Sequence, residues 1–213
     1  MSIPGKFIVV EGLEGAGKTT AIETIKHQLE PIVPNIIVTR EPGGTRLGER
    51  LRALMKESDE GELIDPRAEM LVMYAARVQL IEHVIRPAIR RGDWVIADRF
   101  ELSTYAYQGG GRGIKKDFID SLSAICVQQI KPDLTIYLDI PPEIGLDRVK
   151  MRGETDRIEQ ESLLFFTKVR RCYQEMIYSM DNACHIDASA PVAEVQRSIL
   201  KQLTHYLQKN VLH

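Results

Sequence analysis

Short, continuously apolar runs alternate with longer segments of helical pattern along this chain. The predicted strands are Phe7–Val10, Ile36–Thr39, Trp94–Ala97, Leu134–Leu138 and Cys184–Ile186. Continuous apolar runs are typical of parallel strands that are buried on both faces. The segments between them are long enough for crossover helices. The pattern therefore predicts an α/β fold: a parallel sheet of about five strands, flanked by helices on both faces.

The longest helical pattern runs from about Asp65 to Arg91. Asp65 is a favourable N-cap residue, and Pro66 suits the first helical position. Gly92 provides a stop signal. Pro87 lies inside the pattern, so we expect a kink or a local interruption there, because proline lacks the backbone N–H that a helix uses.

The composition argues against several classes of protein but does not indicate a function. The chain has 213 residues, of which 44% are hydrophobic and 27% charged, and its formal net charge is −2. There is no repeat, linker or block of like charge, so we expect one domain over residues 1–213 and no nucleic-acid surface. The apolar runs fall far short of the roughly 18–20 residues of a membrane span. No signal peptide is evident, and three widely spaced cysteines indicate reduced thiols in a cytoplasmic protein.

A glycine loop lies between the first strand and the next helical pattern. Gly12, Gly17, Lys18 and Thr19 satisfy the pattern G-x-x-x-x-G-K-T. Glycines let several backbone N–H groups point at phosphate oxygens, while the lysine reaches the β- and γ-phosphates and the threonine hydroxyl can ligate Mg²⁺. We expect the triphosphate to bind the whole loop: Gly12, Leu13, Glu14, Gly15, Ala16, Gly17, Lys18, Thr19 and Thr20.

Two further strands end in aspartate. Asp98 follows Trp94–Ala97 and precedes Arg99, at the carboxyl edge where ligands of open α/β sheets collect. Asp98 is the acidic residue expected near the metal, so we predict that it holds Mg²⁺ together with Thr19. Asp139 ends another strand, and for it we expect a structural role.

The loop alone leaves two classes open, small-molecule kinases and GTPase-like or motor-type switches. A GTPase is expected to carry the guanine-reading motif N-K-x-D. The only asparagines are Asn35, Asn182 and Asn210, and none is followed by Lys-x-Asp. The absence favours a kinase or an adenine-nucleotide protein.

A basic segment follows the fourth strand. Arg148, Lys150, Arg152 and Arg157 surround Gly153. The segment fits either a solvated helix-turn surface or a mobile basic flap over phosphates, and we predict a lid at about 148–160.

Several motifs together resemble those of the thymidylate kinases. The motifs are Glu11–Thr20, Thr39–Thr45, Tyr74–Arg77, Asp98–Arg99, Ser103–Gly113, Asp156–Glu159 and Ile186–Ala188, the last matching a loop near the adenine. The resemblance covers nearly the whole chain. It implies a three-layer P-loop kinase fold, a homodimer, and transfer of phosphate from ATP, with Mg²⁺, to thymidine 5′-monophosphate (dTMP), giving the diphosphate.

The resemblance also implies roles for residues that bind dTMP. Arg40 and Arg99 match positions that hold the 5′-phosphate, with Arg52 as a plausible third, and guanidinium groups suit this task because they bind phosphate oxygens bidentately. The base and sugar are expected to contact Arg77 and Thr104 on the thymine, Tyr107 beside the sugar, and Glu14 at the 3′-hydroxyl.

One position departs from the family pattern. Thymine usually stacks on an aromatic residue one helical turn before the base-reading arginine, and here that position is Met73. Met73 lies four residues before Arg77, on the same helix face. A methionine can cover a ring through its polarizable sulfur, although the stacking is less defined.

The loop residue after Glu14 separates subgroups of the family. One subgroup has an arginine there, whereas this chain has Gly15, so it is similar to the bacterial subgroup whose lid supplies the catalytic arginines. We expect Lys18, Arg99, Arg152 and Arg157 to be catalytic, with Arg148 behind them.

Two alternatives to a dTMP kinase remain open from the sequence. One is another pyrimidine nucleoside monophosphate kinase that acts on dUMP, UMP or CMP. The other is a nucleotide-binding module without turnover. In the kinase interpretation the partners are ATP, dTMP and a second copy of the chain, with no nucleic acid and no membrane.

Overall fold

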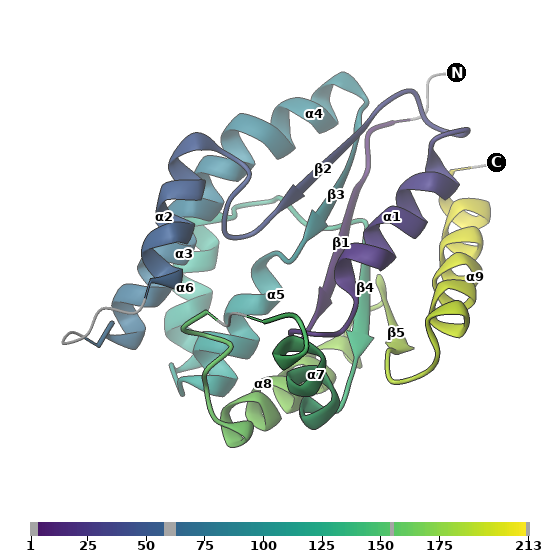
Figure 1. The fold of residues 1–213 in the computed structure, drawn as a ribbon. Helices are drawn as coiled ribbons and strands as arrows, with labels where there is room; N and C mark the ends of the chain where they lie inside the picture. Colours follow the sequence, from purple (N-terminus) through teal and green to yellow (C-terminus); the bar gives the residue numbers. More distant parts are fainter. Residues whose placement is uncertain (1–3, 58–62, 154–155, 212–213) are drawn as a thin grey trace.

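The computed structural model describes residues 4–57, 63–153 and 156–211. Within these ranges, five parallel strands form one sheet in the order β2-β3-β1-β4-β5 (Figure 1). The strands are β1 (Phe7–Gly12), β2 (Ile36–Arg40), β3 (Trp94–Asp98), β4 (Leu134–Asp139) and β5 (Ala183–Asp187). The predicted α/β sheet is confirmed, and each strand extends one or two residues beyond its predicted apolar run.

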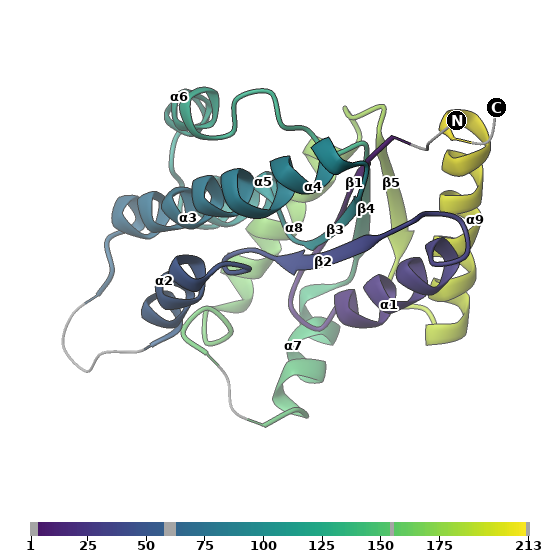
Figure 2. The ribbon, with the colours of Figure 1, turned by 90° about the horizontal axis from the view of Figure 1, so that it is seen from above.

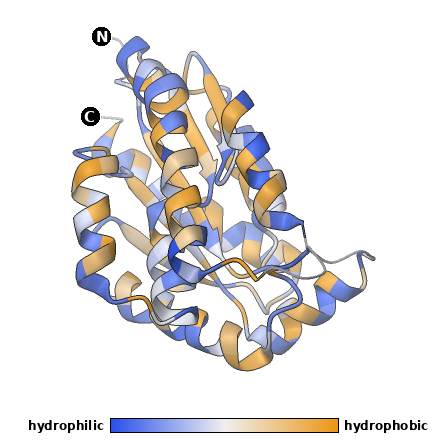
Figure 3. Ribbon diagram, turned by 90° about the vertical axis from the view of Figure 1, so that its left-hand side faces the viewer, coloured by the Kyte–Doolittle hydropathy of each residue, from blue (hydrophilic) through white to orange (hydrophobic). Residues whose placement is uncertain are grey.

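Helices cover both faces of the sheet. The helices are α1 (Lys18–Leu29), α2 (Arg46–Lys56), α3 (Pro66–Leu80), α4 (Arg86–Arg91), α5 (Glu101–Thr104), α6 (Lys116–Cys126), α7 (Pro142–Lys150), α8 (Leu163–Ile177) and α9 (Val192–Asn210). Figure 2 shows α3 and α4 on one side of β2 and β3, with α1 on the other. In Figure 3 apolar and polar residues alternate along the helices, as expected when one side of each helix covers a sheet.

The alternation of side chains along β1 divides the core in two. Ile8 and Val10 pack in one apolar cluster with residues of α1 and α9. Phe7 and Val9 point the other way and pack in a second cluster with residues of α3 and α4. Successive residues of a strand face opposite sides of the sheet, so a continuously apolar strand serves both layers.

The long helical pattern of residues 65–91 is present, with the interruption expected near Pro87. The Asp65 side chain accepts a hydrogen bond from the Arg67 backbone N–H (2.8 Å). A π-helical turn, η1 (Ile81–Ile85), joins α3 to α4, and the Arg86 N–H bonds to the Ile81 carbonyl, five residues back. Proline cannot donate a backbone bond, so the wider turn fits just before it. Gly92 ends the run in a left-handed conformation (φ 87°).

The register of the strands brings the ends of β1, β2 and β3 together at one edge of the sheet. Val10 lies opposite Asp98, and Arg40 lies opposite Asp98 from the other side. The glycine loop starts at the end of β1, so loop, aspartate and arginine meet at the carboxyl edge.

A second π-helical turn, η2 (Tyr105–Gly111), packs against α8. A Cβ added at Gly110 would lie 2.7 Å from the Cys172 Cβ and 3.1 Å from the Lys168 carbonyl oxygen. Real Cβ atoms do not approach so closely, so a glycine is required for this contact. The contact places the residues before and after it, Gln108 and Arg112, beside α3.

The predicted lid at about 148–160 begins inside a helix. Arg148 and Lys150 belong to the last turn of α7, whereas residues 151–153 and 156–161 are irregular. Residues 154 and 155 lie outside the described residues. That this segment acts as a lid on a single domain stays a prediction. In the part of the chain that the structure describes, no helix combines the length and the apolar character of a membrane span.

Candidate active site

Two adjoining pockets lie at the carboxyl edge of the sheet. The outer one, here the phosphate cleft, has a volume of about 330 Å³ and is lined by Glu14, Gly15, Gly17, Lys18, Thr19, Arg40, Glu41, Arg52, Lys56, Asp98, Arg99, Arg148, Arg152, Asp156 and Glu159. The other, here the inner pocket, has a volume of about 110 Å³ and is lined by Glu14, Glu41, Pro42, Arg52, Met55, Lys56, Glu69, Met73, Arg99, Ser103, Tyr107, Gln108, Asp156, Arg157 and Ile158. Both linings include Glu14, Arg52 and Arg99, so the two pockets adjoin.

Lys18 is the cation at the centre of the glycine loop. Its Nζ donates to the carbonyl oxygens of Gly12 (3.3 Å) and Leu13 (3.0 Å). Burial, followed by the nearby charge of Arg99, lowers the pKa of Lys18 to about 8. An anion bound in the cleft opposes both effects, because it stabilises the protonated amine.

The glycine loop touches α7 where Gly15 meets Gly145. Gly15 has a φ of 74°, and a Cβ added to it would lie 2.2 Å from the Gly145 carbonyl oxygen. A Cβ added to Gly145 would in turn lie 2.6 Å from the Glu14 carbonyl oxygen. Backbone meets backbone here, so neither position accommodates a side chain without movement of the loop or the helix.

Asp98 and Thr19 both line the phosphate cleft. The Asp98 Oδ1 atom is buried, and within the described ranges it has no hydrogen-bond partner. Buried carboxylate oxygens normally have a partner, so this atom is available to bind a cation. Carboxylate and hydroxyl oxygens are ligands of magnesium. The two residues therefore fit the predicted metal site.

Arg99 lies in the wall between the pockets. Its Nη2 donates to Glu14 Oε1 (2.7 Å), its Nη1 donates to the Tyr173 hydroxyl (3.2 Å), and its guanidinium carbon lies 4.9 Å from the centre of the Tyr107 ring. Glu14 Oε2 also accepts from the Tyr107 hydroxyl (2.6 Å). Arg99, Glu14 and Tyr107 thus form one cluster at the mouth of the inner pocket.

Glu11, which sequence reasoning gave no role, lies beneath this cluster. Its fully buried carboxylate accepts from the Phe100 N–H (2.9 Å), the Ser103 hydroxyl (2.7 Å) and the Tyr173 hydroxyl (2.9 Å). Burial raises the pKa of Glu11, whereas Arg99 and the three donors lower it. Arg99 has a positive φ of 70°, which is rare for a side-chain-bearing residue. The bond to Phe100 fixes the peptide that follows this strained residue.

Arg40 and Arg52 reach the phosphate cleft from β2 and α2. Arg40 Nη2 is paired with Glu49 Oε2 (2.8 Å). Arg52 Nη1 donates to the Pro42 carbonyl (3.0 Å). Burial and the repulsion of Arg40 lower the pKa of Arg52, which nevertheless stays charged. The structure brings these two predicted phosphate ligands to the same cleft as Arg99.

Arg77 and Thr104 lie behind the wall of the inner pocket rather than in it. Arg77 is 1% exposed, and it donates to Glu41 Oε2 (2.8 Å), to Thr104 Oγ1 (2.9 Å) and to the Phe100 carbonyl (3.2 Å). Burial, partly offset by Arg77, raises the pKa of Glu41 to about 7. The predicted contact of Arg77 and Thr104 with a base stays a prediction.

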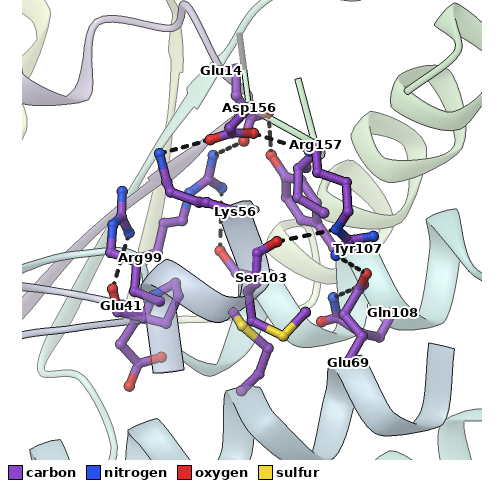
Figure 4. A pocket seen from close by; sticks show the side chains of 15 residues that line it. Glu14, Glu41, Lys56, Glu69, Arg99, Ser103, Tyr107, Gln108, Asp156 and Arg157 are labelled. Atoms are coloured by element: carbon purple, nitrogen blue, oxygen red, sulfur yellow. Dashed lines mark hydrogen bonds and ion pairs between the residues drawn. The ribbon is translucent and has the colours of Figure 1, made fainter. Parts of the chain in front are cut away.

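Met73 lines the inner pocket, together with Met55 and Ile158. Figure 4 shows Arg99 and Glu41 at one end of this pocket and Glu69 with Gln108 at the other, with Arg157 beside them. Met55 and Met73 thus contribute two thioethers to the pocket lining, and thioethers adapt their shape more readily than an aromatic ring.

The three candidate arginines of the lid separate in space. Arg148 Nη1 donates to the carbonyl oxygens of Gly15 (3.2 Å) and Ala188 (3.1 Å). Arg152 lines the phosphate cleft and pairs with Glu159 (2.7 Å). Arg157 instead lines the inner pocket, where it pairs with Glu69. Of these three arginines, only Arg148 and Arg152 line the phosphate cleft in this structure.

A third, mainly apolar cavity adjoins the glycine loop. Its lining includes Gly17, Thr20, Arg148, Ala188 and Val192. Ala188, the last residue of the motif that the resemblance places near the adenine, thus lines one cavity with Thr20 of the glycine loop. Asp139, at the end of β4, is instead bound by Arg170 (2.7 Å) and His185 (3.0 Å), a structural arrangement as predicted.

Sequence reasoning gave no site role to six polar residues of the inner pocket. They are Glu41, Lys56, Glu69, Ser103, Gln108 and Asp156. Glu69, Met73 and Arg77 follow one another at intervals of four on α3, so helical spacing signalled that they share a face. Lys56, paired with Asp156 (2.7 Å), carried no local signal.

A strand, a glycine loop and a helix that open onto a cation-lined cleft are typical of P-loop nucleotide-binding proteins. The family model "Thymidylate kinase" matches residues 10–199. Two curated relatives are the thymidylate kinases of Legionella pneumophila strains Corby and Paris, each 50% identical over 210 residues, covering 99% of both chains. This chain therefore belongs to the thymidylate kinase family.

The contact between Gly15 and Gly145 yields a prediction. Gly145→Ala suits a helix intrinsically, yet its new Cβ would press on the Glu14 carbonyl. We expect the glycine loop to shift and the KM for ATP to rise about tenfold, since displacements near 1 Å can have still larger effects. Steady-state kinetics checks this, with Ile144→Ala, a partly exposed site on the same helix, as the control. An unchanged KM for ATP would show that the loop does not depend on this contact.

Proposed function

We propose that this protein transfers the γ-phosphoryl group of ATP to dTMP, giving dTDP and ADP. The observation that carries the proposal is the shared lining: the phosphate cleft adjoins a smaller, partly apolar pocket, and Arg99 borders both. A nucleoside monophosphate bound with its base in the inner pocket presents its phosphate to the cleft. Membership of the thymidylate kinase family supports dTMP as that acceptor.

The proposed mechanism relies on positioning and charge. Arg99, Arg40 and Arg52 hold the acceptor phosphate, and Lys18 and Arg152 surround the transferred group. The acceptor oxygen is already anionic, so no general base is required, and rate comes from alignment and from neutralised charge. Thr19 and Asp98 would hold Mg²⁺, which would supply positive charge to neutralise the phosphates.

Recognition of the nucleoside is assigned to the inner pocket. We assign Tyr107 and Glu14 to the sugar, because their hydrogen-bonded pair borders the pocket beside Arg99. Met73 and Met55 cover the base. The assignment of Arg77 and Thr104 to the thymine edge rests on the resemblance, and the Arg77 network with Glu41 supports the wall from behind.

A panel of acceptors tests the proposed function. With ATP and Mg²⁺, ADP release should be fastest with dTMP and at least about tenfold slower in kcat/KM with dUMP, UMP and CMP, because one methyl in an apolar pocket discriminates by about this much. Coupled spectrophotometry measures each rate. A preference for CMP or UMP would contradict dTMP as the substrate, and no turnover with any acceptor would favour a nucleotide-binding module.

Arg152→Ala should separate turnover from acceptor binding. Arg152 borders the phosphate cleft and not the inner pocket. We expect kcat to fall at least about a hundredfold, as for other charged groups that stabilise a transition state, while the dissociation constant of dTMP changes less than about twofold. Calorimetry measures the dissociation constant of dTMP, and steady-state kinetics measures kcat. The control is Arg171→Ala, at an exposed position on α8. A large loss of dTMP affinity would show that Arg152 binds the acceptor.

We also propose a cytoplasmic homodimer. All three cysteines are free thiols, as is usual in a reducing compartment. The neighbouring helices α3 and α6 carry exposed apolar side chains: Leu71 is 50% exposed, Phe118 46% and Ile125 71%. Phe118 and Ile125 lie seven residues apart and so on one helix face. Exposed apolar side chains on neighbouring helices fit a self-complementary interface between two copies.

Replacing one apolar residue by a charge tests the dimer. Ile125→Glu places carboxylates in the proposed interface, so we expect a monomer where the unmodified protein is a dimer. Light scattering after size-exclusion chromatography gives the mass of each. Tyr178→Glu, at an exposed site on the end of α8, is the control and should stay dimeric. A monomeric unmodified protein would contradict the proposal.

A further inference from the structure

Glu69 is a buried carboxylate at which two parts of the chain meet. It lies in the first turn of α3, is 2% exposed and lines the inner pocket. Its Oε1 accepts from Gln108 Nε2 (2.9 Å) and Arg112 Nε (3.3 Å). Its Oε2 accepts from Arg112 Nη2 (3.2 Å) and from Arg157 Nη2. One carboxylate therefore receives four donors from three side chains.

These donors come from two separate parts of the chain that meet at one end of the inner pocket (Figure 4). Gln108 belongs to η2 and Arg112 follows it, and both are fixed by the packing of η2 on α8. Arg157 belongs to the irregular segment 156–161, and its Nε also donates to the Met55 carbonyl (3.1 Å). The other end of the segment is also hydrogen-bonded, because Arg112 Nη1 donates to Glu161.

Glu69 is the carboxylate that pairs with both Arg112 and Arg157. Burial raises the pKa of Glu69, but the bonds from Gln108 and Arg157 and the charge of Arg112 outweigh burial, so the net shift is downward and the carboxylate is ionised. A neutral side chain here would leave two partly buried guanidinium groups on one side of a small pocket with only Glu161 to neutralise them.

Gln108 connects Glu69 to the pocket interior. Because its Nε2 donates to Glu69, the amide has a fixed orientation. Its Oε1 is buried, lacks a partner within the described ranges, and belongs to a side chain that lines the pocket. An unsatisfied acceptor of this kind is ready for a donor group on a bound molecule.

Segment 156–161 also reaches the phosphate cleft. Glu159, within it, pairs with Arg152 (2.7 Å), and both line the cleft. Glu69 in the inner pocket is thus connected to Arg152 in the phosphate cleft. Glu69 pairs with Arg157, and Glu159, two residues further along the same segment, pairs with Arg152.

We infer that Glu69 is a positioning residue that couples acceptor binding in the inner pocket to the placement of segment 156–161, and through it of Arg152, beside the phosphates. The inference rests on the proposed function, because it needs an acceptor in that pocket. Coupling of this kind is reciprocal: each substrate tightens the binding of the other by the same factor.

The test compares Glu69→Gln, which keeps the shape and removes the charge, with Glu175→Gln, whose carboxylate pairs with Arg171 on the exposed side of α8. Calorimetry measures dTMP affinity with and without a non-hydrolysable ATP analogue. In the unmodified protein the analogue should tighten dTMP binding, and in Glu69→Gln this coupling should be lost. We expect kcat/KM for dTMP to fall about tenfold or more, the effect of one hydrogen bond to a charged group, while the affinity of the analogue alone stays within about twofold. Glu175→Gln should match the unmodified protein.

A double-mutant cycle separates positioning from general support of the fold. If Glu69 acts through Arg157, then Glu69→Gln combined with Arg157→Gln should lose no more kcat/KM than the worse single variant. Additive losses, or unchanged coupling in Glu69→Gln, would overturn the inference while leaving dTMP kinase activity in place. An unmodified protein without dTMP turnover would instead defeat the proposed function. If Glu69→Gln does not fold, Arg157→Gln alone decides, since unchanged coupling in that variant also overturns the inference.

Discussion

A buried arginine is tolerated only where an anion neutralises it, and this constraint organises the site. Arg77 is neutralised by Glu41, Arg99 by Glu14, and Arg112 and Arg157 by Glu69. An enzyme that binds phosphate groups needs many cations in one place, and each must have a partner before the substrates arrive. The carboxylates of the pocket walls therefore belong to the binding machinery, although they repel phosphate themselves.

The surroundings of Arg99 also fix its orientation before any ligand binds. Arg99 adopts a strained backbone conformation, and its N–H bonds to the Val10 carbonyl (2.9 Å) while Glu11 captures the next N–H. Its side chain lies between Glu14, Tyr107 and Tyr173. A phosphate can thus add to an arginine that is already oriented, so little ordering is needed on binding.

Local sequence patterns predicted the strands and helices. Contacts between segments that are distant in the sequence could not be predicted from such patterns. The five strands and the glycine loop were predictable because each is a continuous stretch of sequence with a characteristic hydrophobic pattern or motif. The interruption near Pro87 was likewise local. The burial of Arg77 behind the pocket wall, by contrast, depends on Glu41 from another strand end and on Thr104 from α5. The separation of Arg152 from Arg157 depends on Glu69, nearly ninety residues earlier. Only the spacing of Glu69, Met73 and Arg77 on α3 gave a hint of their shared face.

The close contact of Gly15 with Gly145 gives a physical reason for where the cleft obtains its arginines. A side chain at position 15 has no room, because the backbone of α7 occupies that space. The same approach brings the last turn of α7 over the loop, so that Arg148, three residues after Gly145, donates to the Gly15 carbonyl. Arg152 follows a turn later and borders the phosphate cleft. The absence of a side chain in the loop and the presence of arginines above it are thus two consequences of one packing contact.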